Sequence, residues 1–178
     1  MRILRGKWQG RAIPFPKGAP TRPLTEKARE ALFHILSHRW QIEGSQVLDL
    51  FAGSGAVGLE FLSRGAARVA FVEQDPRAAH SLRSLLRQWG AEERGRVFQM
   101  DVMMFLATPS TAVQFIFAGP PFRYWQKKRL IQTILEGGWL QEGGCLIVEH
   151  PSYESYADHP SFWRQERYVA SVLSFFRG

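Results

Sequence analysis

A glycine-rich loop with carboxylates spaced around it is the part of the sequence best suited to chemistry. Gly53, Gly55 and Gly58 satisfy the pattern G-x-G-x-x-G directly after an apolar segment that ends at Leu50. Glycines let the backbone turn sharply and approach a ligand closely, which a Cβ would obstruct. With Glu73 following twenty residues after Gly53, the pattern indicates a nucleotide-cofactor loop. The alternative interpretation is a plain tight turn between a strand and a helix.

Two further acidic residues bear on which cofactor this loop would bind. Asp49 ends the preceding strand, where a carboxylate would oppose the pyrophosphate of a nicotinamide dinucleotide. S-adenosylmethionine (SAM) has no phosphate and carries an amino group and a sulfonium, which an acidic strand end suits. Asp101 follows a later strand and offers an acceptor for an adenine amine, whereas Glu73 can accept ribose hydroxyls of either cofactor. The sequence therefore predicts SAM.

A second loop, Gly119-Pro120-Pro121-Phe122, follows another predicted strand. Its two prolines stiffen the backbone, and Phe122 offers a ring face for a flat partner such as a nucleobase. This arrangement suits transfer to an exocyclic amine, whose protons must be held by hydrogen-bond acceptors because its lone pair is delocalised into the ring. The alternative is a proline turn with a core phenylalanine.

The elements that must position these loops alternate between strand and helix. We expect strands at 47–50, 68–72, 97–100, 115–118 and 144–149, helices at 26–38, 55–64, 76–89 and 127–136, and a terminal strand hairpin within 163–176. This order predicts an α/β fold, Rossmann-like, with a mostly parallel sheet and helices on both faces. Before it, residues 2–13 suggest a short strand pair or an extended arm, and prolines between 14 and 23 suggest a hinge.

Positive charge is concentrated at the start of the chain. Residues 1–40 contain nine Lys and Arg side chains against two acidic ones, whereas residues 41–178 contain fourteen of each sign. The net charge of +7 therefore arises in the N-terminal fifth. A polyanionic partner would gain from this, because phosphate contacts release counterions and steer encounter. The alternative is a solvated face that aids solubility. A short cluster, Lys127-Lys128-Arg129, is open to the same two interpretations.

Composition argues against several classes of protein. The 178 residues suffice for one α/β domain and are short for two. No apolar run approaches the roughly 20 residues of a membrane span, and the opening lacks the apolar stretch of a signal peptide. The single Cys145 cannot form an internal disulfide, and no Cys/His cluster has zinc spacing. We therefore expect a cytoplasmic monomer without a metal site.

Several stretches, in the same order along nearly the whole chain, are similar to the bacterial RsmD-type 16S rRNA guanine-N2 methyltransferases. They are G-K-W-Q-G-R at 6–11, Thr21-Arg22-Pro23, the helix at 26–33, D-L-F-A-G-S-G-A-V-G-L-E at 49–60, G-P-P-F at 119–122 and Gly138-Trp139-Leu140. The resemblance implies a single class I methyltransferase domain over 1–178. A basic N-terminal arm or hairpin would occupy 1–24 and a SAM-binding catalytic core 25–178.

The resemblance also implies roles for individual residues. The SAM site would comprise Asp49, Phe51, Gly53, Ser54, Gly55, Glu73, Asp101 and Val102. The target guanine would lie against Gly119, Pro120, Pro121 and Phe122. Contacts to 16S rRNA in the small ribosomal subunit would come from Arg2, Arg5, Lys7, Arg11, Lys17 and Arg22.

One position departs from the family pattern, which is Asp or Asn before Pro-Pro-Tyr/Phe. Gly119 removes that side chain and leaves the Pro120 carbonyl as the only acceptor for the target amine. By loose analogy with an oxyanion-hole donor, losing one such acceptor costs about 10²–10³ in rate. Three explanations stay open: an introduced variant of an active enzyme, a natural member with a substitute acceptor such as Glu149, or a chain that has lost turnover.

Three functions are therefore compatible with the sequence. The first is methylation of a guanine N2 amine in 16S rRNA. The second is a weakly active or inactive factor that binds SAM and rRNA. The third is methylation of adenine N6 in DNA, which the proline-aromatic loop allows but which lacks a further domain for reading a DNA sequence.

Overall fold

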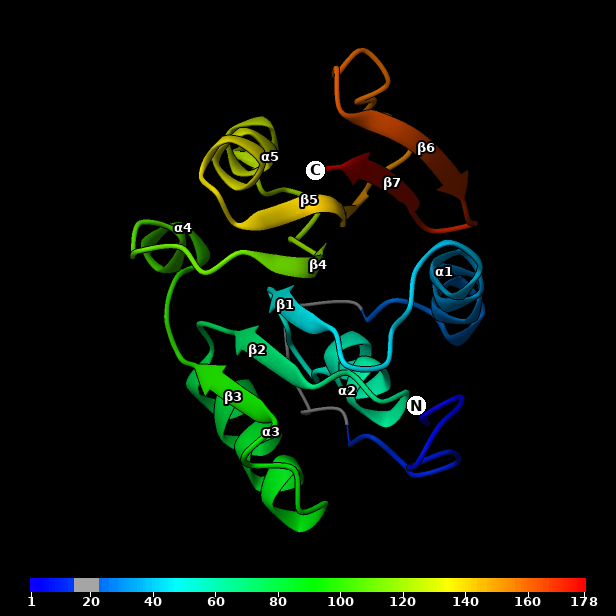
Figure 1. Cartoon of the computed structure of the whole chain (residues 1–178), viewed down its shortest axis with the longest axis vertical. Helices are drawn as coiled ribbons and strands as arrows, with labels where there is room; N and C mark the ends of the chain where they lie inside the picture. Colours follow the sequence, from blue (N-terminus) through cyan, green and yellow to red (C-terminus); the bar gives the residue numbers. More distant parts are fainter. Residues whose placement is uncertain (15–22) are drawn as a thin grey trace.

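The computed structural model describes residues 1–14 and 23–178, and Lys17 and Arg22 lie outside them. In this part the chain forms a sheet with the strand order β3-β2-β1-β4-β5-β7-β6 (Figure 1). The strands are β1 (Gln46–Leu50), β2 (Arg68–Val72), β3 (Gly95–Phe98), β4 (Val113–Ala118), β5 (Leu140–His150), β6 (Phe162–Arg167) and β7 (Val172–Arg177). The first five are parallel, and β7 lies antiparallel to both β5 and β6. The predicted parallel sheet and terminal antiparallel hairpin are confirmed.

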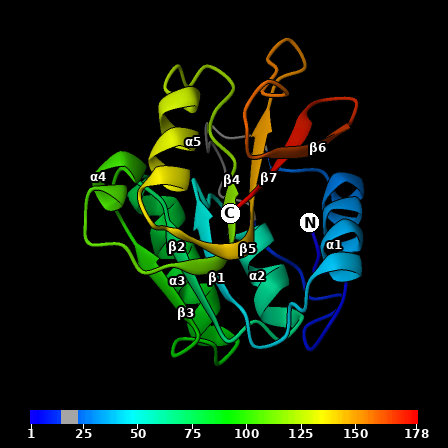
Figure 2. The same cartoon turned by 45° about the horizontal axis from the view of Figure 1, so that its top comes forward.

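Helices cover both faces of the sheet. They are α1 (Glu26–Arg39), α2 (Ala56–Ser63), α3 (Pro76–Gln88), α4 (Val102–Leu106) and α5 (Lys127–Glu136). Figure 2 shows α4 and α5 on one side of the sheet and α1 and α2 on the other. Buried side chains of α1, α2 and α3 form one core cluster, and those of α4 and α5 form a second. None of the helices in the described ranges combines the length and apolarity needed to span a bilayer.

The first fourteen residues are folded onto this core. Ile3, Trp8 and Ile13 are buried, and an isolated antiparallel bridge joins Arg2 to Ala12. The backbone is tied down at Glu60 of α2, whose carboxylate accepts the amide hydrogens of residues 4 and 5 at 2.9 and 3.0 Å. A single bridge pairs the two ends of this segment, and residues 1–14 contain no strand of the expected pair.

One of the cations counted at the start of the chain is not on the surface. Arg29 in α1 is fully buried, its Nε lies 4.0 Å from a carboxylate oxygen of Glu60, and its Nη2 donates to the carbonyl of Arg2. It therefore helps to hold the N-terminal segment and is unavailable to a polyanion.

Several strands begin earlier than expected, and one helix was not predicted. The third strand runs two residues earlier than expected, at Gly95–Phe98, because Asp101 already caps a helix and the chain leaves the sheet before it. That helix, α4, was missed, since five consecutive apolar residues show no helical periodicity. The fifth strand begins at Leu140, four residues early, because a register irregularity in its pairing with β4 accommodates the glycines at 143 and 144.

Candidate functional site

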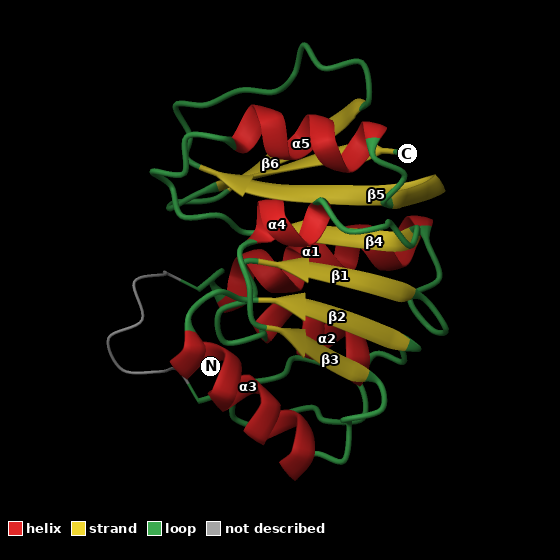
Figure 3. Cartoon of the chain, turned by 90° about the vertical axis from the view of Figure 1, so that its left-hand side faces the viewer, coloured by secondary structure: helices red, strands yellow, loops and turns green. Residues whose placement is uncertain are grey.

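The loops singled out by the sequence meet at one edge of the sheet. Figure 3 shows the arrowheads of β1 to β5 on the same side, so the segments that follow them gather there. The strand order reverses between β1 and β4, which is where ligands of open parallel sheets bind. Leu50 pairs with Ala118, and the amide of Gly119 donates to the Leu50 carbonyl at 3.2 Å. The cofactor loop and the proline loop are therefore direct neighbours.

The glycine-rich loop has the backbone that its sequence predicts. Gly53 and Gly55 have φ angles of 54° and 74°, and Phe51 before them has φ 59°. A Cβ on Gly55 would lie 2.5 Å from a methyl carbon of Leu82, so a side chain fits neither the backbone nor the space. A Cβ on Gly58 would lie 2.9 Å from a carboxylate oxygen of Asp49. The glycines thus let the loop and α2 close over the end of β1.

Asp49 is a buried carboxyl group at the floor of this edge. It is 2% exposed, and its Oδ2 accepts the amide hydrogen of Gly58 at 2.9 Å. Burial raises the pKa of Asp49 to about 8, the Gly58 amide opposes this rise, and the nearby charge of Glu73 adds to it. Burial thus disfavours the charged carboxylate, and a cation bound beside it would favour that form.

Glu73 joins two loops at the end of β2. One of its carboxylate oxygens accepts from the Gly53 amide and the other from the Asp75 amide, both at 2.8 Å. The first of these bonds links residues twenty positions apart. Glu73 is therefore fixed at the junction of the cofactor loop and α3.

Asp101 caps α4 at the end of the next loop. Its Oδ1 accepts the amide hydrogens of Met103 and Met104 at 2.8 and 3.1 Å. Val102, the first residue of α4, is buried and lines the neighbouring pocket. The carboxylate is held in place by its own helix.

Two adjoining pockets occupy the edge of the sheet, and Phe51 and Gly53 line both. The inner one is about 40 Å³ and the outer one about 330 Å³, the latter within the range of small-molecule sites. The inner wall includes Pro23, Leu24, Asp49, Ser54, Phe117, Gly119 and Glu149, and the outer wall includes Glu73, Gln74, Asp75, Met100, Val102 and Pro121.

The charged side chains that line these pockets are acidic among the described residues. The described residues that line them include four carboxylates and no Lys or Arg. Such walls suit the ammonium and sulfonium of SAM and would repel a pyrophosphate. Among the described residues, the negative charge of the walls therefore favours SAM over a nicotinamide dinucleotide, whereas the glycine pattern alone does not distinguish them.

An unsatisfied hydroxyl lies beside the same pockets. Tyr124 packs edge to face on Phe51 with ring centroids 5.1 Å apart, and its hydroxyl oxygen is buried without a hydrogen-bond partner among the described residues. Burial raises the pKa of Tyr124, and the charge of Asp101 adds to this. A buried polar atom without a partner is costly, and a polar ligand in the adjoining pocket is one way to satisfy it. The residues present therefore fit SAM.

The proline loop divides between the two pockets. Gly119 lines the inner one and Pro121 the outer one, whereas Pro120 is buried and Phe122 half-buried outside both walls. Within the described ranges, no three His, Cys, Asp or Glu side chains gather into a group that could hold a metal ion.

Lys127 is a functional candidate whose role the sequence did not reveal. It is 3% exposed, and its Nζ donates to the carbonyls of Phe122 and Tyr124 at 2.7 and 2.9 Å. The same ammonium lies 3.0 Å from a carboxylate oxygen of Glu154 in the loop after β5. Lys127 is therefore neither a phosphate-binding residue nor a solvated one. Its buried ammonium holds the backbone of the proline loop in place. Lys128 and Arg129 are exposed.

The basic residues of the N-terminal segment lie on the surface, and their backbone is held by α1 and α2. Arg2, Arg5, Lys7 and Arg11 are all exposed. The amide of Arg2 donates to Glu26 at the start of α1, near Leu24 of the inner pocket. The amide of Lys7 instead donates to Ser63, the last residue of α2, about 12 Å along that helix from its start beside the cofactor loop.

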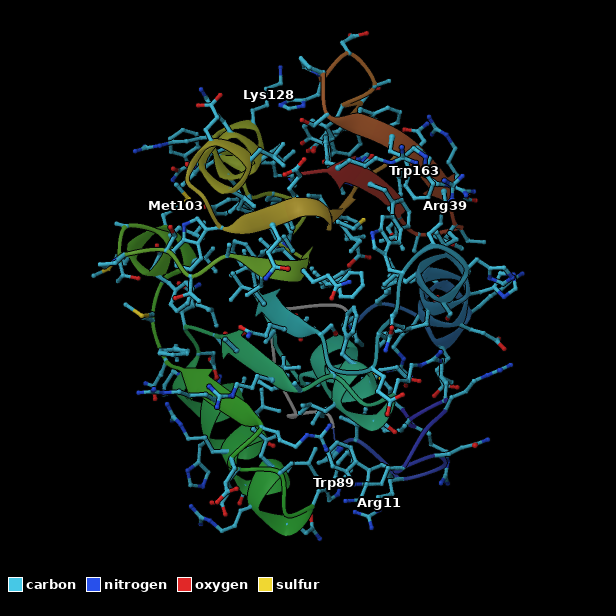
Figure 4. All side chains as sticks on the ribbon, viewed as in Figure 1. Arg11, Arg39, Trp89, Met103, Lys128 and Trp163 are labelled. Carbon is cyan, nitrogen blue, oxygen red and sulfur yellow. The ribbon has the colours of Figure 1, made fainter. Side chains whose placement is uncertain are left out.

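The N-terminal segment also contacts the end of α3. Arg11 lies over the ring of Trp89 at 5.6 Å (Figure 4), and Trp8 packs against the same ring with centroids 5.0 Å apart. Trp8 is therefore a core residue. Arg2 lies close to Arg11 in the fold, because it bridges to Ala12 and its guanidinium donates to the Gly10 carbonyl at 2.9 Å.

Comparison with known proteins gives the family. Residues 1–177 match the family model described as Conserved hypothetical protein 95. The chain is 36% identical over 167 residues to the Ribosomal RNA small subunit methyltransferase D of Escherichia coli K12, covering 94% of this chain and 83% of that protein. The chain belongs to the RsmD-type methyltransferase family.

Solved structures agree with this assignment. A hypothetical protein of Thermus thermophilus superimposes with a TM-score of 0.86 at 32% identity, covering 100% of this chain and 99% of the other. An RNA methyltransferase of Salinibacter ruber in complex with S-adenosyl-L-homocysteine superimposes with a TM-score of 0.67 at 14% identity over 88% and 93% of the two chains, which shows the fold alone. Membership in the RsmD-type family confirms the predicted resemblance, the Rossmann-like class I fold and the SAM-dependent methyltransferase.

Proposed function

We propose that this chain transfers the methyl group of SAM to the exocyclic N2 amine of a guanine in 16S rRNA, acting as a cytoplasmic monomer on the small ribosomal subunit. The observation that carries the proposal is the cation-free, carboxylate-lined pair of pockets, among the described residues, directly beside the Gly119-Pro120-Pro121-Phe122 loop. The rRNA substrate follows from the named activity of the Escherichia coli relative.

The cofactor site divides between the pockets by size and chemistry. The outer pocket would hold the adenosine, with Glu73 accepting the ribose hydroxyls and Val102 forming an apolar wall. Asp101 lines neither pocket but directly precedes Val102, and we expect it near the adenine amine. The inner pocket would hold the methionine end, with Asp49 as counter-ion to its amino group. Phe51, Gly53, Ser54 and Gly55 would form the loop between them. SAM supplies an electrophilic methyl group on a sulfonium that is already a good leaving group.

The target base would lie over the proline loop. The Pro120 carbonyl would accept a proton of the guanine amine, and Phe122 would stack on the extruded base. Gly119 and Pro121 let this loop adjoin both pockets. Lys127 holds the carbonyls of Phe122 and Tyr124 in place. Positioning of this kind contributes much of the rate in group transfer, because the reacting atoms must be aligned.

Surface side chains around the site would bind the RNA. Trp125, in the loop after β4, is 84% exposed, and Tyr153, in the loop after β5, is 78% exposed. Lys127, two residues after Trp125, pairs with Glu154, the residue after Tyr153, so we expect both aromatic rings at the rim of the site. Exposed aromatic rings stack on unpaired bases. The cations Arg2, Arg5, Lys7 and Arg11, with Lys17 and Arg22 outside the described residues, would bind phosphates.

Gly119 favours a second candidate, a factor that binds SAM and rRNA with little or no turnover. It lacks the acceptor side chain that the family pattern places at this position, so it would keep both ligands and lose rate. The two candidates differ in a single observable quantity, which is methyl transfer by the unaltered chain.

The test is transfer of tritiated methyl groups from SAM to undermethylated small subunits, with the labelled nucleoside identified after digestion. Wild type and Gly119→Asp are assayed together, and duplex DNA is the control substrate. We expect label in N2-methylguanosine of 16S rRNA from wild type. Label only from Gly119→Asp would support the binding factor. No label from either protein, or label in DNA adenine in preference to rRNA, would contradict the rRNA assignment.

A further inference from the structure

A carboxylate stands in the space beside Gly119. An ideal Cβ on Gly119 would lie 3.6 Å from Oε2 of Glu149 and 3.1 Å from a ring carbon of Phe117. Gly119 and Glu149 both line the inner pocket. A side chain at position 119 would therefore project toward a carboxylate oxygen that the chain already provides.

The sheet fixes this proximity. Ala118 at the end of β4 pairs with Val148 of the parallel strand β5, so residues 119 and 149 are the next pair along the two chains. Neighbouring strands lie about 4.8 Å apart. Glu149 is also 9% exposed, so its carboxylate cannot swing freely into solvent. Its place beside Gly119 is thus set by strand pairing.

We propose that Glu149 is a catalytic residue that accepts a proton of the target amine in place of the side chain missing at position 119. This deepens the methyl transfer proposed above and rests on it. Together with the Pro120 carbonyl, Glu149 would give the amine two acceptors for its two protons. With both protons held, the nitrogen lone pair turns out of the ring system toward the methyl group.

The reaction then balances without another reactant. The N2 lone pair forms the new nitrogen–carbon bond as the carbon–sulfur pair returns to sulfur, which leaves neutral S-adenosylhomocysteine. The methylated nitrogen carries the positive charge and loses one proton to the Glu149 carboxylate. That proton passes from Glu149 to water when the products leave, which regenerates the carboxylate.

The position of the carboxylate can be tested by moving it from one strand to its neighbour. Glu149→Gln keeps the shape of the side chain and removes the proton acceptor. Gly119→Asp in the same protein returns a carboxylate to the other strand, at a position whose φ is not in the left-handed region. Glu142→Gln, an exposed change on the same strand, is the matched control. Each variant is measured for methyl transfer to small subunits, SAM affinity by calorimetry and thermal midpoint.

We expect Glu149→Gln to lower the rate about 10²–10³-fold, with SAM affinity within about twofold of wild type. The double variant Glu149→Gln/Gly119→Asp should transfer methyl groups at least about tenfold faster than Glu149→Gln alone. Glu142→Gln should have the wild-type rate.

Other outcomes contradict the inference in distinguishable ways. An active wild type with an equally active Glu149→Gln removes the role of Glu149 and leaves the methyltransferase intact. Loss of SAM affinity or of folding in Glu149→Gln makes the residue a cofactor contact or a structural one. An inactive wild type beside an active Gly119→Asp means that Glu149 does not serve as the acceptor. Inactivity of both on rRNA overturns the proposed substrate itself.

Discussion

The cofactor half and the acceptor half of the site differ in how their polar groups are held. On the cofactor side Asp49, Glu73 and Asp101 each accept backbone amide hydrogens from segments two to twenty residues away. On the acceptor side Gly119 has no side chain, and the nearby carboxylate belongs to a residue thirty positions later on the neighbouring strand. The first half is built from local loops and the second from strand pairing. Changes in one half should therefore leave the other intact.

The largest effect should come from Glu73→Ala. It removes the acceptor of two amide bonds that join the cofactor loop to α3, along with the expected ribose contacts. Hydrogen bonds to a charged group contribute about 1.5–3 kcal/mol each, so SAM affinity should fall roughly 10²–10⁴-fold. Calorimetric titration measures this, with the exposed Glu142→Ala as control. Affinity within tenfold of wild type would contradict this role for Glu73.

Lys127→Met tests the acceptor half by loosening its loop. The change removes the ammonium that fixes the carbonyls of Phe122 and Tyr124 and pairs with Glu154. Misplacement by about 1 Å can cost 10²-fold in rate, so kcat should fall by roughly that amount while SAM affinity stays unchanged. Lys128→Met on the same helix is exposed and should have little effect. Equal losses in both variants would mean that bulk charge matters and loop position does not.

Trp125→Ala probes the rim of the acceptor half. Stacking of a base on an aromatic ring contributes about 1–3 kcal/mol, so KM for rRNA should rise roughly tenfold. Because Trp125 is 84% exposed, stability and SAM affinity should not change. Steady-state assays with small subunits supply both constants. An unchanged KM would remove Trp125 from the RNA-binding surface.

A prediction that needs no ligand concerns the pH dependence of stability that Asp49 produces. Its pKa is about 8 in the folded protein and 3.8 ordinarily, so the folded chain binds more protons between these values. The free energy of unfolding should therefore fall as pH rises from about 4 toward 8, by about 1 kcal/mol per unit, and level off above. Denaturant titrations of wild type and Asp49→Asn at several pH values isolate this slope. A slope that persists in Asp49→Asn would assign it to other groups.

The sequence predicted the cofactor half better than the acceptor half, and the difference has a physical origin. Gly53 and Gly55 lie in one short loop, and Glu73 follows Gly53 by the twenty residues that are typical of a nucleotide-cofactor pattern, so this spacing carries the geometry. The contact between Gly119 and Glu149 depends on which strands pair and in what register, which single-chain spacing does not encode. Glu149 was accordingly one candidate among three explanations for Gly119.

Burial explains the remaining differences. Lys127 looked like part of a basic surface cluster, yet three oxygen partners compensate its ammonium inside the fold. Arg29 was counted among the N-terminal charges, yet it lies fully buried beside Glu60. Sequence alone predicts that a charged residue is exposed, because the groups that would compensate its charge inside the fold are not known. For Lys127 and Arg29 these groups include Glu154 and Glu60, which lie in other segments. The number of surface cations is therefore smaller than the sequence suggests.

The most direct test asks whether two buried acidic residues of the inner pocket, Asp49 and Glu149, serve different ligands. SAM is titrated by calorimetry into Asp49→Asn and Glu149→Gln at neutral pH, beside wild type. We expect Asp49→Asn to weaken SAM binding about tenfold or more, because a cation loses its counter-ion. Glu149→Gln should bind SAM within about twofold of wild type. Equal losses in the two variants, or a loss confined to Glu149→Gln, would contradict the assignment of one carboxylate to the cofactor and the other to the target amine.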